Sequence, residues 1–378
     1  MKKTLLTICL TWMCFSLSAQ KIIDLSGKWS FSIDRQDNGE KEKWFSHTLN
    51  DFINLPGSMP EKLKGDEVTA KTQWTGSLYD SSYYYNPYME KYRKEGNIKF
   101  PFFLTPDKHY VGAAWYQKEV NIPADWKGER ILLFLERPHI ETTVWVNGQK
   151  TGMQNSLCVP HQYDITRYVR PGKCTITIRV DNRIKEINVG PDSHSITDQT
   201  QGNWNGIVGR ICLQTTPKTY FDDIQIYPEP EQKLARVKVV IKGTGTAKVK
   251  LSAESFNTDK KHIVPAIQQE IKLNKGVTET EMVLPMGNDM LLWDEFHPAL
   301  YKLKAEVTNG KKTEIKEIQF GMRRFEIKGK WFYVNGRKTQ LRGTVENCDF
   351  PLTGYAPMDV ESWERVFRIC RSLSLIHI

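Results

Sequence analysis

The sequence predicts a mainly β protein: two successive β-sandwiches followed by the first β/α unit of a (β/α)8 barrel. Three observations carry this prediction. Two regions, 21–211 and 220–320, consist of short alternating apolar and polar runs separated by turn residues, a pattern typical of β-sandwiches. After them, residues 323–372 combine a hairpin pattern with apolar residues at helical spacing. A chain of 378 residues is long enough for two or three such domains.

Residues 1–19 have the composition of a secretory signal peptide. They begin with Lys2 and Lys3, continue with an apolar core and end in small residues at Ala19. The core is too short to span a bilayer, so we expect no membrane insertion. Neither Cys9 nor Cys14 directly follows a small residue, which argues against a lipoprotein site. We therefore expect a periplasmic or secreted protein.

Charge and cysteine content exclude several classes of function. The net charge is +9, but basic and acidic residues are interleaved along the chain, which argues against nucleic acid as a partner. The cysteines beyond residue 19 have no regular spacing, so they predict neither a disulfide framework nor a metal site. Buried thiols are the simplest interpretation of Cys158, Cys174, Cys212, Cys348 and Cys370.

No cofactor or metal is expected from the motifs. The chain has no P-loop and no G-x-S-x-G nucleophile motif. His297 lies close to Asp294 and Glu295, which could bind a metal, but no second ligand cluster lies nearby. A capped, packed turn is the simpler interpretation of this stretch.

The first sandwich is expected to occupy residues 20–219. Its opening strand alternates around Trp29, Phe31 and Ile33. Asn147-Gly148 has the composition of a tight hairpin turn. Further strands are predicted at 115–122, 130–135, 142–146 and 175–180.

Two stretches of this domain break the strand pattern. Residues 73–110 form a long loop rich in tyrosine, which suits either a platform for stacking sugar rings or packing against a neighbouring domain. Residues 202–207, G-N-W-N-G-I, place small and amide residues around Trp204. This loop could hydrogen-bond sugar hydroxyls, or it could be a turn held by a buried tryptophan.

The second sandwich is expected at residues 220–320. Alternating strands at 235–241, 247–253, 281–284 and 301–307 fit an immunoglobulin-like domain. Residues 321–378 then predict the start of a barrel: a hairpin with an Asn335-Gly336 turn, a short strand at 339–341, and a helix capped by Asp359. Polar residues after that strand stand where (β/α)8 enzymes place substrate contacts.

Several motifs, in this order, resemble those of glycoside hydrolase family 2, which includes β-galactosidases, β-glucuronidases and β-mannosidases. They are LSGKW at 25–29, AWYQ at 114–117, VWVNG at 144–148, YDIT at 163–166, WNGIVG at 204–209, the LWDEFHPALY corner at 292–301, and the VNG-to-RG stretch at 334–343. The resemblance implies a jelly-roll sugar-binding domain, an immunoglobulin-like domain and a TIM-barrel catalytic domain.

The resemblance also implies the activity. We expect an exported, β-galactosidase-like enzyme that hydrolyses O-glycosidic bonds at the non-reducing end of oligosaccharides or polysaccharides, by a retaining mechanism with two glutamates. In this family both glutamates come from later barrel strands, and a barrel takes about 250 residues, so we expect this chain to lack them. Substrate contacts are expected from Gln201, Asn203, Trp204, Glu346, Asn347 and Asp349.

Two departures from the family pattern argue against a galactoside. Some relatives carry an aspartate just before the W-x-G-I loop, where this chain has Thr200 or Gln201, with Asp198 nearby. Many β-galactosidases have N-R-H-E where this chain has T-V-E-N at 344–347. Residues 373–378 also depart from the pattern, and our hypothesis is that they are translated from a sequencing adapter.

An alternative is a secreted carbohydrate-binding or adhesion protein made of β-sandwiches without catalysis. The predicted β/α unit favours the enzyme, because half a unit with an exposed apolar helix face has no use in a binding protein. The sequence leaves the sugar, the linkage and a homo-oligomeric state open.

Overall fold

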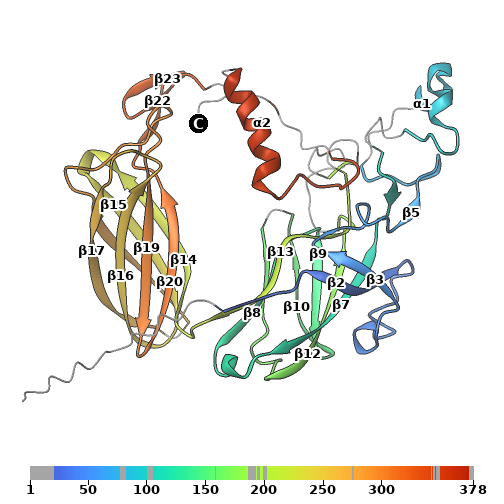
Figure 1. The fold of residues 1–378 in the computed structure, drawn as a ribbon, viewed down its shortest axis with the longest axis horizontal. Coiled ribbons are helices and arrows are strands. Elements are labelled where there is room, and N and C mark those ends of the chain that lie inside the picture. Colours follow the sequence, from blue (N-terminus) through green and yellow to red (C-terminus); the bar gives the residue numbers. More distant parts are fainter. Residues whose placement is uncertain are drawn as a thin grey trace, which may run out of the picture. The chain divides into compact units, whose positions relative to one another are not determined.

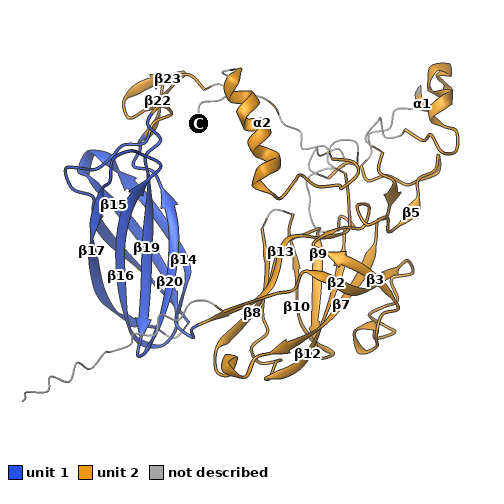
Figure 2. Ribbon diagram, in the orientation of Figure 1, with its two compact units in different colours: residues 1–20, 217–293, 297–324 blue, residues 21–216, 294–296, 325–378 orange. Residues whose placement is uncertain are grey.

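The computed structural model is mainly β (Figure 1) and divides into two compact units (Figure 2). The larger unit contains residues 21–216, 294–296 and 325–378, and the smaller unit contains residues 217–293 and 297–324. The structure describes residues 21–76, 82–99, 105–157, 159–185, 193, 196–198, 202–274, 276–341, 343, 345 and 350–373. The predicted signal peptide lies outside these residues.

Two antiparallel sheets form the sandwich of the larger unit. One has the order β1 (Ile22–Asp24), β13 (Gly206–Thr216), β8 (Arg130–Pro138) and β11 (His161–Asp164), with β4 (Gly57–Ser58) also paired to β13. The other has the order β10 (Gln149–Asn155), β9 (Glu141–Val146), β12 (Gly172–Asp181), β7 (Ala113–Ile122), β2 (Gly27–Asp34) and β3 (Asp51–Leu55).

Alternation of side chains places most apolar residues of both sheets in one core, whereas Trp115 and Trp145 form a separate cluster with Leu49. In the central pair of the second sheet, Ile178 lies opposite Tyr116, and both are fully buried. Leu133 of β8 and Leu213 of β13 lie opposite each other and are buried in the same core. Burying each side chain of this size contributes about 1.5–3 kcal/mol to the free energy of folding. The core therefore gives the loops at its ends a stable base.

The predicted Asn147-Gly148 turn joins β9 and β10. Both residues have positive φ values, 50° and 77°, which glycine and asparagine adopt more readily than other residues. The Asn147 side chain accepts a hydrogen bond from the Thr175 backbone N–H and donates one to the Tyr168 carbonyl oxygen. The turn therefore also ties the hairpin to the neighbouring strand.

The smaller unit packs a three-stranded sheet on a four-stranded one, the arrangement of immunoglobulin-like domains. The first sheet has the order β14 (Tyr220–Glu229), β15 (Leu234–Lys242) and β18 (Val277–Pro285). The second has the order β17 (Ile263–Leu273), β16 (Gly245–Phe256), β19 (Leu300–Asn309) and β20 (Lys312–Phe320). Every second residue of β15 and β19 is buried, as the alternation predicts.

The chain after the smaller unit begins with a small antiparallel sheet. It consists of β21 (Phe325–Lys328), β22 (Trp331–Val334) and β23 (Arg337–Thr339), with the Asn335-Gly336 turn between the last two strands. The prediction of a strand at 339–341 is wrong, because the third strand spans 337–339. It ends where Thr339 pairs with Phe332. Helix α2 (Val360–Ser372) follows, and Asp359 caps it by accepting a hydrogen bond from the Ser362 N–H at 2.7 Å.

These elements do not make a barrel. A barrel needs parallel strand pairs, and none of the named strands in the described part of the chain pairs in parallel. The start of a TIM barrel thus stays a prediction. No helix among the described residues is both long and apolar enough to cross a membrane.

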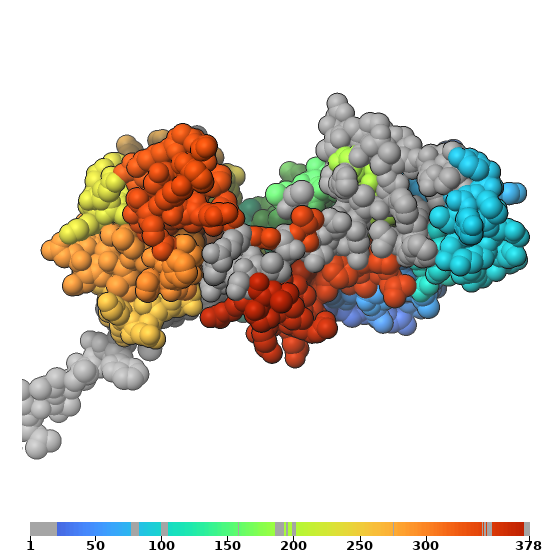
Figure 3. Space-filling model, turned by 90° about the horizontal axis from the view of Figure 1, so that it is seen from above, coloured from blue at the N-terminus to red at the C-terminus, as the bar shows by residue number. Residues whose placement is uncertain are grey.

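The remaining elements are short and lie in loops. They are β5 (Asp66–Glu67), β6 (Lys108–His109), α1 (Ser82–Tyr85), and the 3-10 helices at Trp44–Ser46, Pro87–Tyr92, Ala124–Trp126 and Pro230–Gln232. Of the tyrosine-rich loop at 73–110 the structure describes residues 73–76, 82–99 and 105–110, and the stretch 82–99 is accessible on the face shown in Figure 3 (cyan). Within it, the Tyr83 hydroxyl donates to the Tyr92 carbonyl oxygen, whereas Tyr85 and Tyr88 are exposed.

Candidate functional site

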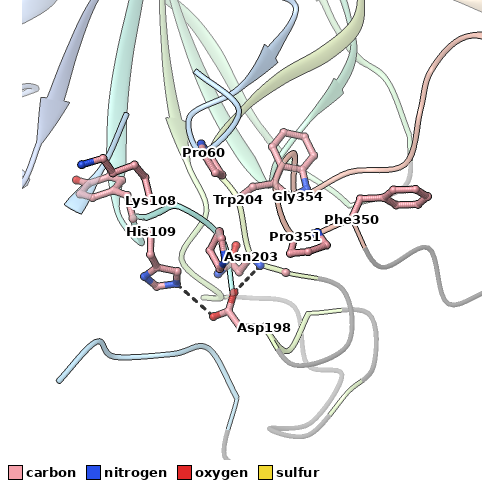
Figure 4. Close-up of a pocket in the computed structure, with 12 residues that line it drawn as sticks. Pro60, Lys108, His109, Asp198, Asn203, Trp204, Phe350, Pro351 and Gly354 are labelled. Carbon is pink, nitrogen blue, oxygen red and sulfur yellow. Dashed lines mark hydrogen bonds and ion pairs between the residues drawn. The ribbon is translucent and has the colours of Figure 1, made fainter. Parts of the chain in front are cut away.

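Loops at one end of the larger unit's sandwich enclose a small cavity (Figure 4). Its volume is about 30 Å³, which is room for about one water molecule. The lining comes from stretches far apart in the sequence: Pro60, Pro106, Lys108–Tyr110, Asp198, Gly202–Trp204, Phe350, Pro351 and Gly354. The cavity therefore lies where loops of the predicted sugar-binding domain meet residues that follow β23.

Asp198 ties three of these loops together. Its carboxylate is buried and accepts hydrogen bonds from the backbone N–H of Thr75 at 2.6 Å and of Asn203 at 2.7 Å. His109 Nε2 lies 3.4 Å from the same carboxylate, as Figure 4 shows. Because both oxygens are engaged with the protein, the carboxylate sets the shape of the cavity rather than projecting freely into it.

Asn203 presents an unused acceptor in this region. Its side-chain nitrogen donates to Thr75 Oγ1 at 2.9 Å and to the Asn182 carbonyl oxygen at 3.0 Å. Its Oδ1 is buried and makes no hydrogen bond of good geometry among the described residues, although an interaction with the His139 ring partly offsets the lowering of that histidine's pKa by burial. A buried oxygen without a full hydrogen bond costs about 1–3 kcal/mol, a cost that a water in this cavity would remove.

Trp204 is a packing residue on the other side of the cavity. It is 5% exposed, and its ring stacks on His139, with the ring centroids 4.6 Å apart and the planes at 18°. Tyr355 packs against it at 5.6 Å. Gly354 has a positive φ of 80°, and a Cβ there would lie 2.8 Å from Trp204 Cβ, so only glycine fits this approach.

Residues 350–355 are held on the sandwich by hydrogen bonds as well. The Tyr355 hydroxyl donates to Glu61 Oε2 at 2.7 Å, and the Ser58 hydroxyl donates to the Thr353 carbonyl oxygen. Burial raises the pKa of Tyr355, and the Glu61 carboxylate adds to this, so the phenol remains a donor at neutral pH. The stretch that leads from β23 to α2 therefore has a fixed place on the sandwich.

Two buried histidines in the larger unit are held in the neutral form. His139 lies under Trp204, and burial lowers its pKa to about 4. His161 is fully buried on β11, where its Nδ1 lies 2.6 Å from Thr142 Oγ1, and burial lowers its pKa to about 4 as well. Neither ring is a free proton donor at neutral pH.

Two of the six predicted substrate-contacting residues are described. Asn203 and Trp204 both line the cavity, the first with an unused oxygen and the second by packing. The other four, Gln201, Glu346, Asn347 and Asp349, lie outside the described residues. Sequence reasoning missed His109, His139 and Tyr355, since isolated histidines and tyrosines in loops carry no pattern that separates them from ordinary packing residues.

The stretch around His297 forms a turn. Asp294 Oδ1 accepts a hydrogen bond from the Phe296 N–H at 2.8 Å, which is how a capped turn is made. Across the described ranges, no group of three or more His, Cys, Asp or Glu residues could hold a metal ion. Cys174 and Cys212 are buried, and burial raises the pKa of both thiols.

Comparison with known proteins places both sandwiches in one family. The family model for the sugar binding domain of glycosyl hydrolases family 2 matches residues 22–217. A second model, described as glycosyl hydrolases family 2, matches residues 219–323. Together the two matches cover most of the chain.

Individual relatives agree with these matches. The chain is 24% identical to a β-glucuronidase of Paenibacillus borealis, over 89% of this chain and 51% of that protein. It is 23% identical to a β-galactosidase large subunit of Latilactobacillus sakei, over 90% of this chain and 52% of that protein. The chain thus spans about half the length of these curated relatives.

The fold is similar to that of a solved family member. The crystal structure of Ruminococcus gnavus β-glucuronidase matches with a TM-score of 0.66 and 19% identity, over 94% of this chain and 53% of that one. At this identity the likeness is informative about the fold alone. With both family models matched in sequence order, the chain belongs to glycoside hydrolase family 2.

Proposed function

We propose that this chain is the sugar-binding part of an exported glycosidase that removes terminal β-linked sugars from oligosaccharides or polysaccharides. The observation that supports this proposal is the cavity lined by Asp198, Asn203, Trp204 and Gly354. At this cavity, loops of the sandwich contact the stretch that leads into α2. Family membership supports hydrolysis of glycosidic bonds as the reaction. Residues 1–19 support export, since they have the composition of a signal peptide.

The proposed mechanism divides binding from bond cleavage. A retaining glycosidase needs two carboxyl groups about 5–5.5 Å apart, one as the nucleophile and one as the acid and base. In our proposal both are glutamates of later barrel strands that this chain does not contain. Asn203 Oδ1 is proposed to reach a sugar hydroxyl through one water in this cavity, while Asp198 and Tyr355 hold the loops around it. Glu346, Asn347 and Asp349 are proposed to contact the same sugar.

The sugar is proposed to be a β-glucuronide or a β-galactoside. A β-glucuronidase and a β-galactosidase large subunit match the chain over similar lengths. The replacement of the aspartate before the W-x-G-I loop by Thr200 or Gln201 favours a sugar other than galactose. The glucuronide is therefore the first substrate to assay.

The test is to express the chain with its leader and with its natural continuation, and to assay nitrophenyl β-glucuronide, β-galactoside and β-mannoside. We expect activity in the periplasm or medium, from a protein starting at Gln20, with one of the first two substrates preferred at least about tenfold. Asn203→Ala should lower kcat/KM about tenfold, the effect of one water-mediated hydrogen bond to substrate, whereas Asn257→Ala in the smaller unit should not. Binding of sugars without any turnover would instead support the alternative of a carbohydrate-binding protein.

A further inference from the structure

The larger unit contains a second and much larger cavity. It is an open groove of about 490 Å³, within the size range of small-molecule sites. Its walls include β5 and the stretch that follows it, the start of β7, and Arg183 beyond β12. The groove adjoins the smaller cavity, because His109 and Tyr110 line both.

The charged walls of this groove are already paired. Arg35 donates to Asp66, Lys108 to Glu67, and Arg183 to Asp37 at 2.6 Å. Arg183 is further fixed by Asp181, a fully buried carboxylate 2.6 Å from its Nη2. The walls are therefore held in place before any ligand arrives, and their opposite charges largely cancel.

Several hydrogen-bonding atoms in the groove have capacity to spare. Arg35 donates hydrogen bonds to Asp66 through Nε and Nη2, and Arg183 donates to Asp181 through the same two atoms. Nη1 of each arginine is therefore left for a ligand. The Lys71 ammonium has no partner among the described residues, and it is exposed. Gln73 donates through Nε2 to the Lys71 carbonyl oxygen, which leaves its Oε1 as an acceptor. The groove is thus lined by both donors and acceptors.

We propose that this groove binds a neutral oligosaccharide, as a second sugar site separate from the cavity at Asn203. Hydroxyl groups both donate and accept, so a sugar can satisfy guanidinium N–H groups and carboxylate or amide oxygens together. An ion would gain little from walls whose charges cancel. The groove would hold a stretch of a longer glycan beside the reacting end. Binding of the glycan in this groove does not depend on the proposed hydrolysis.

The test uses the 378-residue chain and three neutral probes: β-1,4-linked galactotetraose, cellotetraose and xylotetraose, with galacturonate tetramer as the charged comparison. We expect titration calorimetry to detect at least one neutral tetraose, with a Kd that changes less than about twofold between 50 and 500 mM NaCl, because a neutral ligand is not screened. The Lys71→Ala, Gln73→Ala double variant should raise that Kd at least about tenfold.

A matched variant separates this site from the rest of the protein. Lys261→Ala removes an exposed lysine of the smaller unit. This variant should bind the tetraose as the parent chain does. Failure of all neutral probes, binding only of the charged tetramer with salt dependence, or an unchanged Kd in the double variant would each overturn the proposal. None of these results bears on hydrolysis by the extended protein.

Discussion

Replacing Asp181 with asparagine should destabilise the larger unit by about 3 kcal/mol or more, because it removes the anion at the centre of a buried ion network. Asp181 is fully buried and lies 3.0 Å from Arg179, 2.6 Å from Arg183 and 2.7 Å from Lys185. Burial pushes the pKa of Asp181 up, but hydrogen bonds from Arg183 and Lys185 outweigh it and hold the pKa well below its usual range. With a neutral side chain there, the three cations would share only the carboxylates of Asp37 and Glu141.

The measurement is urea unfolding followed by tryptophan fluorescence. Asp51→Asn is the matched control, because Asp51 pairs with Lys64 at 2.6 Å but is more than half exposed. Its loss should cost under about 1 kcal/mol, as for other surface pairs. Equal shifts of the unfolding midpoint in the two variants would contradict the role assigned to the network.

Acidification from pH 6.5 to pH 4 should destabilise the larger unit through His139 and His161. Both rings have a folded-state pKa of about 4, below the ordinary value of 6.5, so the unfolded chain takes up protons first as the pH falls. The stability that they contribute is present above pH 6.5 and is lost across this window. Each pKa shift corresponds to about 3 kcal/mol of folding free energy. The combined loss for both histidines therefore exceeds that expected for the Asp181 variant.

Urea midpoints measured at half-unit steps from pH 7.5 to pH 4 give the dependence. Two histidines predict a slope of up to about 2.7 kcal/mol per pH unit inside the window. His161→Gln should halve that slope. A flat profile between pH 6.5 and pH 4.5 would show that neither ring is held neutral by burial.

The two sandwiches could be predicted because their signal is local. Alternation around Trp29 gives the buried face directly, and Asn147-Gly148 gives the turn. Along residues 175–180 it gives the apolar face, but not the burial of Thr177 and Arg179 on the other face. The strand at 339–341 was misplaced because an alternating pattern does not say where pairing stops. The pairing of Phe332 with Thr339, set by the turn at Asn335-Gly336, decides it.

The candidate site was predicted only in part, because its contacts join residues far apart in the sequence. The sequence singles out Asn203 and Trp204 as an unusual loop, but not what each side chain does. That Trp204 lies between His139 and Tyr355 depends on three loops meeting in space. The spare oxygen of Asn203 likewise exists only because Thr75 and Asn182 occupy its nitrogen.

The proposed division between sugar binding and bond cleavage is tested most directly by assaying the 378-residue chain beside the same chain with its natural continuation. We predict hydrolysis of nitrophenyl β-glucuronide or β-galactoside by the extended protein only. The 378-residue chain, shown to be folded by its cooperative urea transition, should release no more nitrophenol than buffer. Clear turnover by the 378-residue chain would contradict the proposal that this chain lacks both catalytic glutamates.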